Sequence, residues 1–149
     1  MRSVGVILVL LLASTAYAQP PGACLVERYE WHDADTPVKC VLRLPWGVLL
    51  DEPRGIRAVG YDAWEIGSRG GADVTDAERE RGRRALDEIR VLSVGKSLYA
   101  VPTGRGSRDS FGRPLARLFL VRGNEVVDLA EWCRERGHCR PSTAKGNDQ

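Results

Sequence analysis

The sequence of 149 residues has little net charge, few histidines and no long apolar run. Its formal charge is +2, from 22 Lys and Arg against 20 Asp and Glu, so the overall field is weak and charge alone does not indicate a nucleic-acid partner. The apolar run at residues 4–13 is too short to span a bilayer. A composition with 43% hydrophobic and 28% charged residues argues against disordered, collagen-like and polytopic membrane proteins.

The N-terminus has the features of a signal peptide. Arg2 gives it a positive start, residues 4–13 form the apolar segment, and Ala-Tyr-Ala at 16–18 is a small-x-small cleavage site before Gln19. We therefore predict that residues 1–18 are removed and that the mature protein is secreted or periplasmic, with no membrane attachment after cleavage. An uncleaved anchor is the alternative.

The predicted export indicates that the four cysteines form disulfides. In an oxidising compartment an even number of cysteines indicates disulfides, and here two pairs are local in the sequence. Four cysteines allow three connectivities; the local pairs Cys24–Cys40 and Cys133–Cys139 are the favoured one, and two bridges of any connectivity would leave no free thiol. A zinc site is the competing interpretation, but no C-x-x-C pair is present and there are only two histidines.

Short apolar strands and two helices are predicted along the rest of the chain. Thr75 and Glu78 form a capping-box pattern that begins an amphipathic helix, and Gly95 is placed to end it. Strands are expected at residues 25–31, 38–44, 56–61, 97–101 and 115–121, with a short apolar segment at residues 48–50, and a second helix is expected at about residues 127–136. These elements predict an α+β, mainly β fold, a five-stranded OB-fold barrel with flanking helices.

The domain organisation follows from the same elements. Residues 19–26 are expected to be an N-terminal lead-in, residues 27–139 a single domain, and residues 140–149 a flexible polar tail. A chain of this length is one domain by default.

Two groups of acidic residues are candidates for a site. Asp33 and Asp35 lie two residues apart at a strand end, where paired carboxylates suit a hard cation such as calcium, although Asp-x-Asp-Thr is also a common turn sequence. Arg57 begins a predicted strand that ends near Asp62, and Glu65 lies in the following turn. A cation and two acids thus meet at one strand end, either as a site or as ordinary surface charges.

A third group is basic. Residues 105–122 contain five Arg and one acid, Asp109, which makes a local basic patch suited to phosphate. A charged loop that keeps the protein soluble is the alternative. Two aromatic residues, Tyr61 and Phe111, lie within these groups and can either stack on bases or belong to the core.

Taken in order, the three motifs resemble the staphylococcal nuclease (thermonuclease) family. They read Asp-x-Asp-Thr at 33–36, Arg-x4-Asp-x-x-Glu at 57–65 and Arg-Asp-x-aromatic-Gly-Arg at 108–113, and the resemblance covers about residues 27–137. It implies an OB-fold nuclease that uses Ca²⁺ to hydrolyse phosphodiester bonds of DNA and RNA, leaving 3′-phosphate ends.

The resemblance also implies roles for individual residues. They fall on Asp35 and Asp62 as calcium carboxylates, the Ala63 carbonyl as a further calcium ligand, Arg57 and Arg113 as phosphate-binding arginines, Glu65 as general base, Asp33 as a nearby second acid and Asp109 as the Asp of the third motif. The chain departs from the family pattern at Ala34, Pro37 and Trp64, where the family has Gly, an apolar strand residue and Pro.

We therefore expect an exported, monomeric, calcium-dependent nuclease of low sequence specificity, because such a site contacts the phosphate backbone rather than base edges. Its substrates would be DNA and RNA, preferentially single-stranded or unstructured. The main alternative is a non-catalytic OB-fold module that binds nucleic acid. A secreted interaction protein stapled by disulfides is a second alternative.

Overall fold

The computed structural model describes residues 19–67, 74–104 and 106–140. The predicted signal peptide at residues 1–18 lies outside these ranges, as do residues 141–149 of the predicted tail. Within these ranges, no helix is long and apolar enough to cross a membrane. The first strand begins at Cys24, so the last residues assigned to the lead-in belong to the folded domain.

In the part of the chain that the structure describes, seven strands form one sheet, accompanied by two helices. In chain order the elements are β1 (Cys24–Asp33), β2 (Thr36–Arg43), the 3-10 turn η1 (Pro45–Gly47), β3 (Leu49–Glu52), β4 (Arg57–Ala58), α1 (Asp76–Ser93), β5 (Ser97–Pro102), β6 (Leu115–Arg122), β7 (Glu125–Asp128) and α2 (Leu129–Glu135). The strand order is β3-β2-β1-β5-β6-β4, with β7 paired to β6, and all pairs are antiparallel except β4 with β6. The fold is therefore α+β and mainly β, as the sequence predicts.

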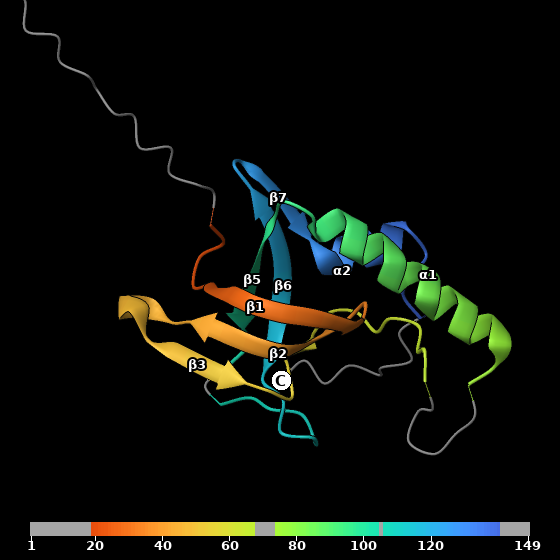
Figure 1. The fold of residues 1–149 in the computed structure, drawn as a ribbon, viewed down its shortest axis with the longest axis horizontal. Helices are drawn as coiled ribbons and strands as arrows, with labels where there is room; N and C mark the ends of the chain where they lie inside the picture. The colour runs from red at the N-terminus through yellow and green to blue at the C-terminus, as the bar shows by residue number, and fades with distance from the viewer. Residues whose placement is uncertain (1–18, 68–73, 105, 141–149) are drawn as a thin grey trace, which may run out of the picture.

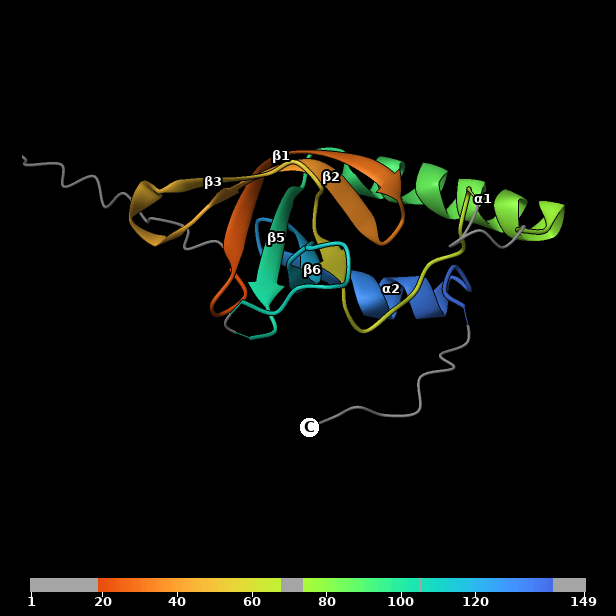
Figure 2. The ribbon, with the colours of Figure 1, turned by 90° about the horizontal axis from the view of Figure 1, so that it is seen from below.

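The two halves of the sheet cross each other. Figure 1 shows β1, β2 and β3 lying across β5 and β6 at a steep angle. In Figure 2 the helices lie toward one end of the molecule, and the β2–β3 hairpin projects from the other. Backbone bonds from the β4 segment reach both halves, because Ile56 N–H donates to Pro37 O at 2.9 Å and Val59 N–H donates to Ala116 O at 3.0 Å. The β4 segment therefore connects the start of β2 to β6.

Helix α1 begins and packs as its sequence predicts. The Thr75 hydroxyl accepts from Glu78 N–H at 3.2 Å, and the Glu78 carboxylate accepts from Thr75 N–H at 3.0 Å, which completes a capping box. The buried face of the helix consists of Gly82, Ala85, Leu86 and Ile89. Glycine is required at Gly82 because a Cβ there would lie 2.7 Å from the carbonyl oxygens of both Trp64 and Glu65.

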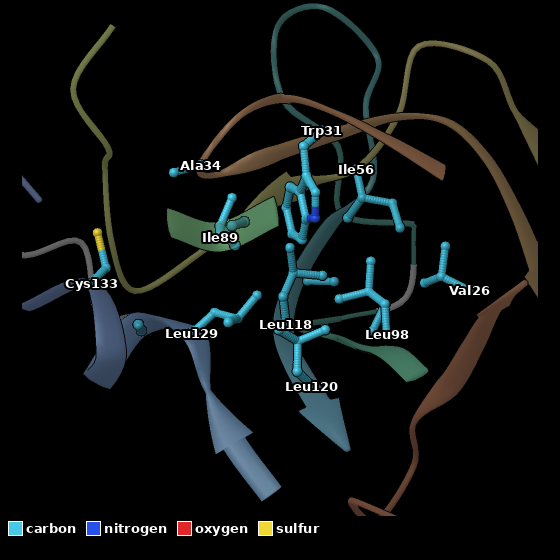
Figure 3. Close-up of a cluster of buried hydrophobic side chains, with 14 of the residues drawn as sticks. Val26, Trp31, Ala34, Ile56, Ile89, Leu98, Leu118, Leu120, Leu129 and Cys133 are labelled. Carbon is cyan, nitrogen blue, oxygen red and sulfur yellow. The ribbon is translucent and has the colours of Figure 1, made fainter. Parts of the chain in front are cut away.

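The hydrophobic core lies between the two halves of the sheet and the helices. Figure 3 shows side chains from both halves and both helices meeting there, among them Trp31, Ile56, Ile89, Leu118 and Leu129. The indole N–H of Trp31 donates to Ser93 Oγ at 3.0 Å, so this large buried side chain has its polar atom satisfied.

The tip of the β2–β3 hairpin is apolar. Residues 44–50 carry no charge, and the turn predicted at Pro45–Gly47 is present. Trp46 adopts a φ of 65° and is 98% exposed, so its indole lies in solvent.

Two elements differ from the sequence prediction. The strand expected at residues 56–61 is reduced to β4, because Gly60 turns the chain with a φ of 88°. The helix expected from residue 127 begins only at Leu129, because the residues before it pair with β6 as β7. Asp128 ends that strand and caps α2 by accepting from Ala130 N–H at 2.9 Å.

One of the two predicted disulfides forms. Cys133 and Cys139 are bridged, whereas Cys24 and Cys40 are buried free thiols, so the predicted Cys24–Cys40 bridge is wrong. The strand register explains the difference, because the residue beside Cys40 on β2 is opposite Arg28 on β1. Cys24 therefore lies roughly 13 Å further along the ladder. A disulfide requires Cα atoms within about 7 Å of each other.

Candidate active site

Two acids from separate parts of the chain converge on one arginine. Asp35 lies in the turn between β1 and β2, Arg57 begins β4, and Asp62 follows the turn at Gly60. Arg57 Nη1 donates to Asp35 Oδ1 at 2.7 Å, and Nη2 donates to Asp62 Oδ1 at 2.5 Å. One guanidinium thus joins the two carboxylates that the resemblance assigns to calcium.

Burial governs the electrostatics of these acids. Asp35 is 2% exposed, and Asp33 beside it is also buried. Burial raises the pKa of Asp33 well above its ordinary value, and the charges of Asp35 and Glu65 raise it further. Burial alone would lower the pKa of Arg57, but the charge of Asp35 and the hydrogen bond and charge of Asp62 outweigh it and raise the pKa. Asp33 therefore keeps its proton to higher pH than an ordinary aspartate, and Arg57 keeps its positive charge between Asp35 and Asp62.

Residues 62–65, here called the acid loop, are fixed by contacts with distant segments. Ala63 N–H donates to Asp35 Oδ2 at 2.9 Å, which ties the loop to the β1–β2 turn. The backbone of Glu65 lies against α1 at Gly82, where the missing Cβ permits the close approach. The β1–β2 turn and α1, which are far apart in the sequence, thus both position the loop that carries Glu65, and the charge of Glu65 acts on Asp33.

Residues 108–113, here called the arginine loop, are organised by Asp109. The Asp109 carboxylate accepts from the backbone N–H groups of Phe111 at 3.0 Å and Arg113 at 2.8 Å, and from Arg113 Nε at 2.7 Å. Partial burial raises the pKa of Asp109, but the hydrogen bonds from Arg113 and Phe111 and the charge of Arg113 outweigh it, so the pKa lies below its ordinary value. The loop turns at Gly112, which has a φ of 78°.

Thr36 connects the arginine loop to the acids. Its hydroxyl donates to Asp35 Oδ1 at 2.8 Å and accepts from Arg113 Nη1 at 3.3 Å. Arg113 is therefore one hydroxyl away from the carboxylate that also binds Arg57. Sequence reasoning gave Thr36 no role, although its position directly after Asp35 in the first motif was the available signal.

The aromatic and basic residues beside the site have distinct positions. Tyr61 is buried and donates its hydroxyl to Ala34 O at 3.0 Å, so it belongs to the core and is not placed to stack on a base. Phe111 is 69% exposed, with the Arg113 guanidinium 5.6 Å from its ring centroid. Arg108 has a structural contact that sequence reasoning missed, because its Nη2 donates to Glu52 Oε1 at 2.7 Å and anchors the arginine loop to β3.

The acids supply the ligands that calcium prefers. Carboxylate and carbonyl oxygens are its usual ligands, and Asp35, Asp62 and the Ala63 backbone are of that kind. The two carboxylates lie within reach of one cation, since the Arg57 guanidinium binds both. In the described ranges, no three His, Cys, Asp or Glu side chains are arranged to hold a metal ion, whereas the set that the resemblance implies has two carboxylates and one carbonyl.

Comparison with known proteins adds no assignment. No protein-family model matches the chain, and no curated protein matches it significantly. What the protein does is therefore inferred from its motifs and from the contacts of Asp35, Arg57 and Arg113.

Proposed function

We propose that this protein is an exported, calcium-dependent nuclease that hydrolyses phosphodiester bonds of DNA and RNA and leaves 3′-phosphate ends. One observation carries the proposal: Arg57 binds both Asp35 and Asp62, which belong to separate motifs of the resemblance. Arg113, from the third motif, is linked to the Asp35 carboxylate through the Thr36 hydroxyl. If the three motif matches were accidental, there would be no reason for their residues to lie in contact.

The fold that accompanies this proposal is a five-stranded OB-fold barrel. We treat β3 and β4 as two halves of one bent strand, because the chain between them stays bonded to β2: Lys39 N–H donates to Pro53 O at 3.2 Å, and Ile56 N–H to Pro37 O at 2.9 Å. Since β4 also pairs with β6, the bent strand would close a ring with β2, β1, β5 and β6. The helices α1 and α2 would flank that ring.

Calcium would be held by the carboxylates of Asp35 and Asp62 and by the Ala63 carbonyl. When bound, the ion supplies positive charge that neutralises phosphate and favours the ionisation of water. Two carboxylates and one carbonyl are fewer ligands than calcium takes, so we expect weak binding in the absence of a nucleotide.

Three side chains would carry the chemistry. Glu65 takes the proton of the attacking water, a role that typically contributes about 10²–10⁴-fold to the rate. Arg57 and Arg113 donate hydrogen bonds to the phosphate oxygens, on which a second negative charge develops as water attacks. To do so, Arg57 would replace one of its carboxylate partners with phosphate. Arg113 would replace the contact of its Nη1 with Thr36 by one with phosphate, while its Nε stays bonded to Asp109.

Single-stranded or unstructured nucleic acid is the substrate that this arrangement suits. Both arginines address phosphate, which carries no sequence information, so low sequence specificity follows. Exposed Phe111 can stack on any base, because every base offers an aromatic face.

The deciding experiment incubates the mature protein with single-stranded DNA in calcium and in chelator. We expect degradation in calcium, no degradation in chelator, and 3′-phosphate ends on the products. Glu65→Gln should lose most of kcat and keep the fold, whereas Glu131→Gln, at an exposed position on α2, is the matched control. A Glu65→Gln enzyme with nearly parental kcat would refute the proposed base. DNA binding without cleavage by the wild-type protein would instead favour the non-catalytic binding module.

Calcium binding provides a second test that needs no substrate. Titration calorimetry should show weak binding that is lost in Asp35→Asn and in Asp62→Asn. The control is Asp87→Asn, which makes the same change in charge on the exposed side of α1, away from the site. Undiminished binding in Asp35→Asn would contradict the assigned ligands.

A further inference from the structure

The chain after α2 runs alongside the acid loop. Two backbone hydrogen bonds join the two segments, from Trp64 N–H to His138 O at 3.3 Å and from Arg140 N–H to Asp62 O at 2.8 Å, and together they form an antiparallel bridge between Ala63 and Cys139. Residues 138–140, here called the C-terminal segment, thus pair with the acid loop through one isolated antiparallel bridge. The sequence prediction assigned Arg140 to a flexible tail, but its backbone is bonded to this loop.

The C-terminal segment is itself fastened to both helices. Its disulfide joins Cys139 to Cys133, a fully buried residue of α2. Two side-chain contacts tie it to α1, from His138 Nε2 to Glu88 Oε2 at 2.8 Å and from Arg140 Nη2 to Glu78 Oε1 at 3.0 Å. The disulfide is the covalent member of this set, and it spans only six residues of sequence.

On its other side, the acid loop is held by groups of the site itself. Ala63 N–H is bonded to Asp35, and the Asp62 carboxylate is bonded to Arg57. A bound cation or phosphate would compete for these side chains. The C-terminal segment holds the loop through backbone atoms, so its hold does not depend on the side chains that would bind a ligand.

We infer that the Cys133–Cys139 disulfide positions the acid loop, so that the redox state of this bridge sets the metal affinity of the site. The metal readout rests on the proposed function, whereas the positioning of the loop does not. Neither cysteine belongs to the three motifs.

The redox step requires a dithiol reductant. One thiolate of the reductant attacks Sγ of Cys139, which is less buried than Cys133, and expels the Cys133 thiolate. The second thiol of the reductant then breaks the mixed disulfide and releases Cys139 as a thiol. Two electrons and two protons pass to the protein, and the reductant leaves as its own disulfide.

Amide hydrogen exchange tests the positioning without metal or substrate. Reduction of the wild-type protein, or the double variant Cys133→Ser/Cys139→Ser, should raise the exchange rates of the Trp64 and Arg140 amides about tenfold or more, because local opening becomes easier. The Ile56 amide, which is bonded to Pro37 and not to the C-terminal segment, is the internal control and should not change.

Calorimetry with calcium alone tests the consequence for the site. Loss of the bridge should weaken calcium binding by about 10–100-fold, the usual effect of removing a group that orients metal ligands. The matched control is Cys24→Ala/Cys40→Ala, which keeps the bridge and should remain sensitive to reductant. The Cys133→Ser/Cys139→Ser protein should be insensitive to reductant.

The outcomes separate the two proposals. If calcium does not bind the oxidised wild-type protein, the proposed function fails, while the exchange rates still decide whether the disulfide positions the loop. Equal Trp64 exchange in oxidised and reduced protein overturns the positioning role. If the double variant does not fold, reduction and reoxidation of wild-type protein in one sample provide the same comparison, with circular dichroism to verify the fold. The substitution Arg140→Gln removes the side-chain contact with Glu78 but keeps the disulfide, so the exchange rate of the Trp64 amide should rise less than it does on reduction.

Discussion

The acid loop and the arginine loop reach the same site, but they are held in different ways. The acid loop depends on partners from distant parts of the chain, namely the β1–β2 turn, α1 at Gly82 and the C-terminal segment. The arginine loop is organised chiefly by its own Asp109, which accepts three hydrogen bonds from residues two to four positions away. One loop is therefore a product of the tertiary structure, and the other is largely a local motif.

This difference predicts which kinds of change each loop tolerates. A substitution far from the site can displace the acid loop, because contacts with several distant elements hold the loop in position. The arginine loop should respond mainly to changes within itself and to loss of its few outside anchors, Glu52 and Arg54 among them. Three experiments test this contrast and a fourth tests the core around β1 and β2, in order of decreasing expected effect.

Replacing each site arginine with lysine should have the largest effect. Lysine keeps the charge but not the paired donors, and loss of a preorganised donor typically lowers kcat by ~10²–10³. Steady-state kinetics should show this loss for Arg57→Lys and Arg113→Lys. Melting temperature should separate them, because a lysine at position 57 cannot span Asp35 and Asp62 and so also loosens the acid loop.

The control for both variants is Arg117→Lys. Arg117 lies on β6, is exposed and pairs with Asp128 away from the acids. If all three lysine variants lose the same activity, the basic residues act as a general electrostatic surface and the two-arginine arrangement is wrong.

The substitution Gly82→Ala tests the dependence of the acid loop on α1. The new Cβ would lie 2.7 Å from two carbonyl oxygens of the loop, so helix and loop must separate. We expect the free energy of unfolding to fall by about 1–3 kcal/mol, as for other overpacked sites, despite the better helix propensity of alanine. Urea denaturation measures the loss, and Arg83→Ala on the exposed side of the same helix should show none of it.

The substitution Asp109→Asn tests the local character of the arginine loop. Asparagine keeps one acceptor oxygen but loses the charge that faces Arg113 Nε, so kcat should fall about tenfold while stability changes by only about 0–1 kcal/mol. Because the folded pKa of Asp109 lies below its ordinary value, its contribution to stability is present above about pH 4 and is lost as the pH falls through the folded pKa. Melting curves of both proteins between neutral and acidic pH should therefore converge at the acidic end. A large loss of stability at neutral pH would show that this loop also depends on the wider fold.

The free cysteines should show the smallest effect. Burial raises the pKa of Cys40 to about 12 and also raises the pKa of Cys24, so neither thiol is a reactive thiolate at neutral pH. A thiol reagent should modify none of the described cysteines in the native oxidised protein, and two after unfolding. Rapid modification of the native protein would mean that the core around β1 and β2 opens easily.

Local sequence signals predicted the elements that local interactions determine. The capping box at Thr75 and Glu78 located the start of α1, because its two hydrogen bonds are formed within one turn. The strand β7 was missed, because Val126 and Val127 fit a helical pattern as well as a strand and only pairing with β6 decides between them. Propensity alone does not resolve such short apolar segments.

The site was predictable only in part for the same reason. The motifs indicated Asp35, Arg57 and Asp62, and the structure joins these three residues directly. No pattern in the sequence links the acid loop to Cys139 or to Gly82, because those contacts depend on how α1 and α2 pack. The free state of Cys24 likewise follows from strand register, which spacing between cysteines does not reveal.

The exposed indole at the hairpin tip has a consequence for optical experiments. The protein has four tryptophans, and Trp46 in solvent should emit at long wavelength and be quenched readily, whereas buried Trp31 and Trp132 should be shielded. Trp64 lies in the acid loop between two cations, with the Arg81 and Arg140 guanidinium carbons 4.8 and 5.4 Å from its ring centroid. In a Trp46→Phe background, the emission accessible to a solvent quencher would come mainly from half-buried Trp64, so the chain has its own spectroscopic probe two residues from Asp62.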